Sequence, residues 1–326
     1  FLKYPAHSAG SIMTIEYVNL YKDMTVKQAM AHIKETGLNK ETVYTCYVTN
    51  KNWILEGIVT LRSLVTSEEY MKIEDLMEDD IIYVNTHDDQ ESVGNLFTKY
   101  GFMALPVVDN ENRLTGIITF DDILDVIEQE ATEDFQKMAA LAPTEERYLD
   151  SSVFLLAKHR IPWLLILMIG ATITGGIISK FEDVLSSVVA LTAFIPMLMD
   201  TGGNSGNQSS TLIIRGLATG EITFKDKWKV LWKEFRISII SGIILASVNF
   251  LKNMFIDQVG LAVSITVSIT LVFAVMLAKI IGGMLPLVAK KLKLDPAIMA
   301  GPLITTIVDA ITLTLYFTVA TLLLNL

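Results

Sequence analysis

Asp309 is a single carboxylate inside a long apolar stretch at the end of the chain. Residues 297–326 carry no other charged side chain. At a helical rise of about 1.5 Å per residue, Asp309 lies roughly 18 Å beyond Ala297, near the middle of a bilayer. Burying an acid there costs at least ~3 kcal/mol and usually marks an ion or proton pathway. The alternative is an acid whose hydrogen bonds come from hydroxyl groups of a neighbouring helix.

A polar run interrupts an earlier apolar segment, residues 184–214. It reads Asp200-Thr-Gly-Gly-Asn-Ser-Gly-Asn-Gln-Ser-Ser210. Amide groups and backbone cannot face hydrocarbon without partners, so we expect the run to line a wet cavity or to lie buried in protein. The expected pore-lining side chains are Asn204, Asn207 and Gln208, with a carbonyl freed by Pro196. Its glycines allow either close helix packing or local unwinding.

The segment around Asp309 has a similar character at its start. Gly301 and Pro302 predict a kink. Thr305 lies four residues before Asp309, so both side chains share one helical face. A hydrogen-bond network between helices is the alternative to a pore lining for both segments.

The second half of the chain predicts an all-α membrane domain, residues 161–326. Five apolar stretches are long enough to cross a bilayer: 161–181, 184–214, 236–256, 261–289 and 297–325. Lysine and arginine residues gather before the first stretch and in two alternate connections. The positive-inside rule therefore places residues 1–160 in the cytoplasm and the C-terminus outside.

The first half differs in charge. Residues 1–160 contain 27 Asp and Glu against 14 Lys and Arg, whereas residues 161–326 contain 9 against 12. An acidic surface argues against nucleic acid as a partner and suits divalent cations. Cys46 is the only cysteine, which excludes an intramolecular disulfide and favours a reducing compartment. Because the chain begins at Phe1 without a signal peptide, we expect a missing upstream region.

The acidic half repeats itself. Gly57-Ile-Val-Thr-Leu-Arg-Ser-Leu64 and Gly116-Ile-Ile-Thr-Phe-Asp-Asp-Ile123 match at an offset of 59 residues, and each follows a short strand and a turn. The pattern predicts a β-turn-β-α unit used twice. It resembles a tandem pair of CBS domains, an α/β regulatory module, with 1–72 holding the N-terminal segment and first domain and 73–134 the second.

Many CBS domains bind adenine nucleotides through a threonine and an aspartate three residues later. The second copy has Thr119 and Asp122, but the first has Ser63 in place of the acid. The resemblance therefore allows ATP binding at one copy. Capping of the following helix is the alternative role of these side chains.

Acidic residues are concentrated at the end of the repeat. Residues 71–134 contain 17 Asp and Glu against three Lys and Arg. Carboxylates three or four positions apart destabilise a helix unless counter-ions are present, and they offer the oxygen ligands that Mg²⁺ and Ca²⁺ prefer. A solvated acidic surface is the alternative. Residues 135–160 follow as a mostly helical connector that Pro143 interrupts.

The membrane half resembles the MgtE family of magnesium channels. The resemblance rests on Pro196-x₃-Asp200-Thr-Gly-Gly-Asn-Ser-Gly-Asn-Gln, on Asp295-Pro-Ala and on Gly301-Pro-Leu-Ile-Thr-Thr-Ile-Val-Asp309. It implies a homodimer in the plasma membrane whose two Asp309 carboxylates hold a hydrated Mg²⁺ between the membrane domains. It also implies an N-terminal helical domain that these residues lack, and closure of the pore by cytoplasmic Mg²⁺ bound to regulatory ligands: Asp89, Glu91, Asp122, Asp125, Glu130, Glu133, Asp134 and Asp295.

Two other functions fit part of the sequence. A secondary transporter, or a channel for Co²⁺ or Ca²⁺, uses the same intramembrane acid. An intramembrane aspartyl protease needs Asp200 and Asp309 as a dyad that shares a proton. The protease interpretation leaves the acidic repeat unexplained.

Overall fold

The computed structural model describes residues 4–144, 146 and 148–325. The chain divides into two compact units, Phe1–Ala131 and Thr132–Leu326. The boundary falls inside helix α5 (Phe120–Met138), so the helix that ends the repeat continues into the second unit.

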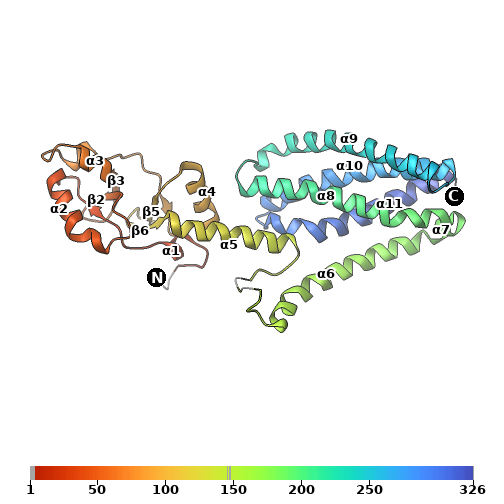
Figure 1. Cartoon of the computed structure of the whole chain (residues 1–326), viewed down its shortest axis with the longest axis horizontal. Coiled ribbons are helices and arrows are strands. Elements are labelled where there is room, and N and C mark those ends of the chain that lie inside the picture. Colours follow the sequence, from red (N-terminus) through yellow and green to blue (C-terminus); the bar gives the residue numbers. More distant parts are fainter. Residues whose placement is uncertain (1–3, 145, 147, 326) are drawn as a thin grey trace. The chain divides into compact units, whose positions relative to one another are not determined.

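The first unit consists of two three-stranded sheets of the same design (Figure 1). The strands are β1 (Asn19–Leu20), β2 (Thr45–Thr49) and β3 (Leu55–Thr60) in one sheet, and β4 (Val84–Asn85), β5 (Ala104–Val108) and β6 (Leu114–Thr119) in the other. In each sheet the first pair is parallel and the second antiparallel. The helices of this unit are α1 (Ala9–Ile12), α2 (Val26–Thr36), α3 (Leu61–Thr66) and α4 (Gln90–Tyr100), with 3₁₀ turns η1 (Gly37–Asn39) and η2 (Ile73–Asp75).

The two sheets confirm the predicted repeat of 59 residues. Tyr47 pairs with Ile58, and Pro106 pairs with Ile117. The copies also meet reciprocally, because the Leu55 N–H donates to the Asn112 carbonyl at 3.2 Å and the Leu114 N–H donates to the Trp53 carbonyl at 2.8 Å. This reciprocity is the pseudo-twofold pairing expected of a CBS pair.

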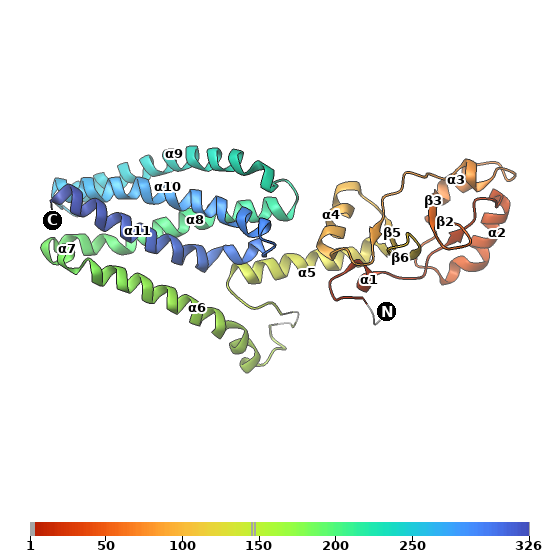
Figure 2. The same cartoon turned by 180° about the vertical axis from the view of Figure 1, so that it is seen from behind.

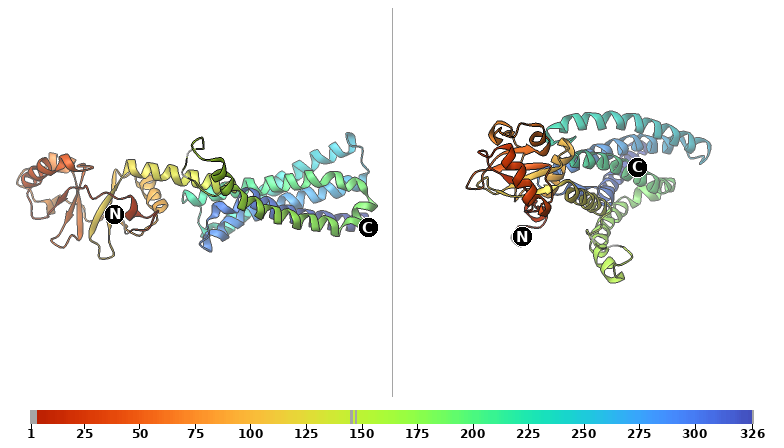
Figure 3. Two further views of the ribbon diagram at one scale, coloured as in Figure 1. Left: turned by 90° about the horizontal axis from the view of Figure 1, so that it is seen from below. Right: turned by 60° about the vertical axis from the view of Figure 1, so that its left-hand side comes forward.

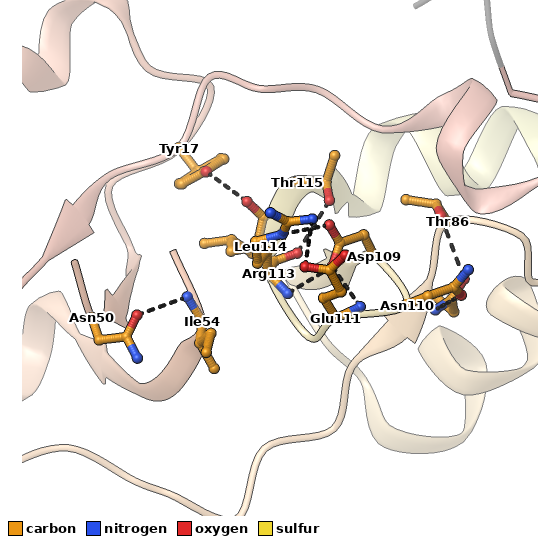
Figure 4. Close-up of polar contacts among 11 residues, drawn as sticks. Tyr17, Asn50, Ile54, Thr86, Asp109, Asn110, Glu111, Arg113, Leu114 and Thr115 are labelled. Carbon is orange, nitrogen blue, oxygen red and sulfur yellow. Dashed lines mark hydrogen bonds and ion pairs between the residues drawn. The ribbon is translucent and has the colours of Figure 1, made fainter. Parts of the chain in front are cut away.

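The hairpin turns are equivalent as well (Figure 4). Asn50 Oδ1 accepts hydrogen bonds from the N–H groups of Asn52 at 2.8 Å and Ile54 at 3.1 Å. Asp109 Oδ1 accepts from the N–H groups of Glu111 and Arg113, both at 2.9 Å. A side-chain oxygen therefore organises each turn from the same position of the repeat.

The second unit is helical. Beyond the end of α5 it contains α6 (Val153–Lys180), α7 (Glu182–Ser187), α8 (Ile195–Ala218), α9 (Lys227–Phe255), α10 (Leu261–Lys291) and α11 (Gly301–Leu324). Short 3₁₀ segments precede three of these helices: η3 (Val189–Phe194), η4 (Phe224–Asp226) and η5 (Pro296–Met299). Helix α10 packs against α8, α9 and α11, and α6 packs against α11; Figures 2 and 3 show these helices from other sides.

The predicted count of five apolar spans is not reproduced. Among the described residues, four segments are long and apolar enough to cross a membrane: Val153–Lys180, Phe224–Phe255, Leu261–Lys291 and Pro296–Leu324. The remaining stretch, 184–214, is divided among α7, η3 and α8. Helix α8 has 24 residues, but its polar run lowers its hydropathy.

The predicted helical connector at 135–160 is also corrected. Helix α5 ends at Met138, and α6 begins at Val153 with Ser152 as its N-cap. Ala140 has φ of 54°, a left-handed conformation that ends a helix. Among the described residues the connector therefore consists of the end of α5, a non-helical stretch that contains the predicted interruption at Pro143, and the first turns of α6.

Glycines let α8 and α10 touch through their backbones. A Cβ atom on Gly282 would lie 2.1 Å from the Gly206 carbonyl oxygen. By contrast, a Cβ atom on Gly175 in α6 would meet nothing within 4 Å.

We predict that Gly282→Ala destabilises the helical unit by about 1–3 kcal/mol, because two backbones must separate to admit the methyl group. Thermal unfolding of the full chain in detergent measures this as a lower Tm. The matched control Gly175→Ala leaves the Tm unchanged or slightly raised. Equal melting of the two variants would contradict the close packing of α8 and α10.

Candidate functional site

Helix α8 carries a polar stripe along one face. Asp200, Asn204 and Gln208 follow each other at helical spacing and are exposed, and Asn207 beside them is half-buried. The Asn204 Nδ2 donates to Asp200 Oδ1 at 3.0 Å. We call Asp200, Asn204, Asn207 and Gln208 the α8 stripe. In a bilayer these amides and this carboxylate need protein or water as partners.

An adjoining face of α8 packs closely on α11. A Cβ atom on Gly202 would lie 2.9 Å from Thr312 Oγ1, and one on Gly203 would lie 2.8 Å from Thr305 Cγ2. The helix is continuous from Ile195 to Ala218. Of the two alternatives left open for these glycines, close packing is therefore the one adopted, and local unwinding is not.

Asp309 lies on α11 beside this contact. It is the ninth residue of a helix of 24, roughly 12 Å from the start at Gly301. Its carboxylate is half-buried, and Oδ1 is buried without a hydrogen-bond partner among the described residues. Such an atom carries an uncompensated desolvation cost.

Neighbouring hydroxyl groups do not satisfy this acid. Thr305 Oγ1 donates to the Gly301 carbonyl at 3.1 Å, and Thr306 Oγ1 donates to the Pro302 carbonyl at 2.9 Å. Both donors are thus committed to the backbone of their own helix.

The two prolines of this region begin helices and do not kink them. Pro196 lies in the first turn of α8, and Pro302 lies in the first turn of α11. A proline fits there because the first N–H groups of a helix have no partner within it. The predicted kink at Gly301 and Pro302 and the predicted carbonyl freed by Pro196 are corrected accordingly.

Gly301 joins three elements. Its N–H donates to Asn207 Oδ1 at 2.9 Å, so one amide of the α8 stripe holds the start of α11. Its φ is 51°, and a Cβ atom there would lie 2.2 Å from the Met138 carbonyl oxygen. The end of α5 is therefore packed against the beginning of the helix that bears Asp309.

A lysine side chain lies at the same end of the helical unit as Gly301. The Lys137 ammonium forms ion pairs with Glu133 and, at 2.5 Å, with Asp295 Oδ2. Burial alone would lower the pKa of Lys137, but hydrogen bonds and negative charge from Asp295 and Glu133 outweigh it and raise that pKa above its usual value. Asp295 Oδ1 also accepts from the Ala297 N–H at 2.8 Å. Two acids expected to be regulatory ligands thus share one ammonium group.

The acids of the first unit mostly have local partners. Asp89 is the N-cap of α4, and Glu130 Oε1 accepts from Gln90 Nε2 at 2.7 Å. The Thr119 hydroxyl donates to Asp122 Oδ2 at 2.7 Å at the start of α5. Within the described part of the chain, no group of three or more His, Cys, Asp or Glu side chains is placed to hold a metal ion. The regulatory assignments, including Glu91, Asp125 and Asp134, stay predictions.

One buried acid has no distinctive signal in the sequence. Glu234 on α9 is 6% exposed, and its Oε2 accepts from Ser209 Oγ at 2.5 Å. Glu234 lies among the basic residues Lys233 and Arg236, so the sequence presents it as part of a charged loop. Lys279 is also 6% exposed and donates to Gln208 Oε1 at 3.4 Å. It does not pair with Asp309.

Comparisons with known proteins agree with this architecture. A family model described as a divalent cation transporter, MgtE, matches residues 195–319, and the CBS domain model matches 9–69 and 73–129. "Magnesium transporter MgtE" of Thermus thermophilus is 38% identical over 323 residues, which is 99% of this chain and 71% of the relative. The protein of the same name in Bacillus subtilis is 38% identical over 98% of this chain and 70% of the relative.

A solved structure adds a local likeness. The cytosolic domain of the Mg²⁺ channel MgtE in complex with ATP has 39% sequence identity and a TM-score of 0.38, and covers 38% of this chain and 50% of that one. MgtE proteins are transporters and not enzymes, so the protease alternative is set aside. The identity over nearly the whole chain, the CBS pair and the apolar helices together lead to one conclusion: this chain belongs to the MgtE family.

Proposed function

We propose that this chain forms a Mg²⁺-selective channel in the plasma membrane, with Asp309 as its main ion-binding side chain. The observation that carries the proposal is the buried Asp309 Oδ1, which has no hydrogen-bond partner among the described residues. A divalent cation would supply the missing interaction. The similarity to magnesium transporters of two bacteria supports the choice of ion.

The chemistry of the site suits a hydrated Mg²⁺. This ion loses its water reluctantly, so a pore selects it through oxygen atoms that contact its hydration shell. Asp309 offers carboxylate oxygen, and the α8 stripe offers amide oxygen. The two helices that carry these groups have Pro196 and Gly301-Pro302 in their first turns. Thr305 contributes to the close contact between them.

A second copy of the chain would complete the pore. The α8 stripe is exposed in one chain and cannot face hydrocarbon. A homodimer that buries the two stripes around a wet channel removes this cost and brings two Asp309 residues together. In this arrangement α8 crosses the membrane together with the four apolar spans, which gives five spans in total. The first unit is then cytoplasmic and the C-terminus lies outside, as the basic connections favour.

We further propose that cytoplasmic Mg²⁺ closes the channel. Closure requires the ion to bind the closed state more tightly than the open one. The acids at the end of the first unit repel each other when no ion is present, which supplies that difference. The packing of Met138 on Gly301 gives α5 a route to the pore helix. Whether Thr119 and Asp122 also bind ATP stays a prediction.

We predict that Asp309→Ala abolishes Mg²⁺ flux into liposomes, lowering it to that of protein-free vesicles, because the ion loses its charged ligand. The variant still folds, because removal of this carboxylate oxygen leaves no described hydrogen-bond partner unsatisfied. The control Thr314→Ala alters an exposed residue of the same helix and keeps normal flux. Wild-type flux through Asp309→Ala would reject this pore, and Co²⁺ or Ca²⁺ flux that outcompetes Mg²⁺ would favour the alternative cation channel.

We also predict that alanine at Asp122, Asp125 and Asp134 together keeps the channel open when cytoplasmic Mg²⁺ is millimolar. Single-channel recording measures open probability as Mg²⁺ is raised. Alanine at Glu16, Glu35 and Glu41 is the matched control, since it removes three exposed acids from the first unit, away from helix α5. Unchanged inhibition by Mg²⁺ in the first variant, or equal loss in both, would count against the sensor.

A further inference from the structure

Asp200 is the carboxylate of the α8 stripe, and the function proposed above gives its negative charge no role of its own. It lies on the exposed face of α8, in the second turn of the helix. Its one described side-chain hydrogen bond comes from Asn204 at 3.0 Å. No ion pair to Asp200 occurs among the described residues, although Lys279 lines the same groove. Its negative charge is thus uncompensated within one chain.

The packing of α8 on α11 fixes the level of Asp200 relative to Asp309. Gly202 meets both Val308 and Thr312, whereas Gly206 meets Ile304, so the two helices run in opposite directions. Asp309 is therefore level with about residue 203 of α8. Asp200 lies roughly 5 Å further along, about one helical turn, on the side away from the start of α11. In the proposed orientation that is the outer side.

The groove beside Asp200 is polar and carries opposite charges at its two ends. A groove of about 450 Å³ between α8, α9 and α10 is lined by Asp200, Asn204, Gln208 and Lys279, among others. Lys279 donates to Gln208, which is eight residues or roughly 12 Å from Asp200 along α8. Negative charge therefore lies at one end and positive charge at the other. A divalent cation is attracted to the Asp200 end and repelled from the Lys279 end.

Two carboxylates about one turn apart in a site of low dielectric repel each other unless a cation lies near both. Asp309 has a buried oxygen without a hydrogen-bond partner among the described residues. A hydrated divalent cation is large enough to be contacted through its water by one carboxylate and then by the next. Asn204 and Asn207, on the same helix as Asp200, offer further polar contacts at this level.

We infer that Asp200 is an outer cation-binding residue of the same permeation path, which collects a hydrated divalent cation and delivers it to Asp309. This inference rests on the proposed function. It assigns Asp200 to the loading of the pore at low external Mg²⁺ and leaves the obligatory site to Asp309. A purely structural Asp200 would act through its hydrogen bond to Asn204, which an asparagine side chain of the same shape preserves.

The test measures Mg²⁺ flux against external Mg²⁺ for the full chain in liposomes. We expect Asp200→Asn to raise the concentration for half-maximal flux on the order of tenfold, through loss of one nearby charge, with unchanged maximal flux. Asp200→Glu keeps the charge and restores the wild-type value. Asp183→Asn removes an exposed acid from the helix that precedes α8 and is the control for general surface charge. We expect Asp183→Asn to keep the wild-type Mg²⁺ concentration for half-maximal flux.

A second variant adds the charge back chemically. Cys46 is the only cysteine and is buried, and burial raises the pKa of its thiol to about 12, so it resists thiol reagents. Asp200→Cys therefore offers a single reactive site. A sulfonate-bearing thiosulfonate reagent restores low-concentration flux, whereas a trimethylammonium reagent reduces it further.

Each result decides the inference. An unchanged concentration dependence in Asp200→Asn overturns it, as does complete loss of flux, which would make Asp200 part of the obligatory site. Equal shifts in Asp200→Asn and Asp183→Asn attribute the effect to surface charge and also overturn it. Failure of the proposed function is recognised separately, because the wild-type chain would then carry no Mg²⁺ at all and the inference would fail with it.

Discussion

The helical unit depends on one constraint: polar groups within membrane-length helices must have partners other than hydrocarbon. Hydroxyl groups meet this constraint within their own helix, as Thr305 does through the Gly301 carbonyl. The amides of the α8 stripe and the Asp309 carboxylate do not meet it fully within one chain. We propose that water, a cation and a second copy of the chain supply the missing partners, which makes this helical bundle a candidate pore.

Close packing makes that arrangement possible. Glycines let the backbones of α8 and α10 nearly touch and let α8 pack closely on side chains of α11, the helix that bears Asp309. Gly301 then links the start of α11 both to Asn207 and to the end of α5. The Lys137 ammonium holds Glu133 and Asp295 together at the same end. A change at the end of α5 therefore has a short mechanical route to the helix that bears Asp309.

Much of this was predictable because repeats and intramembrane charge leave local signals. The offset of 59 residues reappears in the pairing of Tyr47 with Ile58 and of Pro106 with Ile117. The predictions that were wrong concern features that depend on contacts with other helices. The sequence around Pro196 and Pro302 does not distinguish a helix start from a kink, and the basic residues flanking Glu234 conceal its burial. The polar run that identifies α8 as functional is also what removes it from the apolar spans.

The central claim is that a cation completes the coordination of Asp309 between two chains. Electron cryomicroscopy of the full chain in lipid nanodiscs containing Mg²⁺ tests it most directly. The account predicts a dimer with the two α8 stripes facing one axis and density for a hydrated ion between the Asp309 carboxylates. A map in which the stripes face lipid, or in which Asp309 pairs with Lys279 in a dry interior, would contradict it.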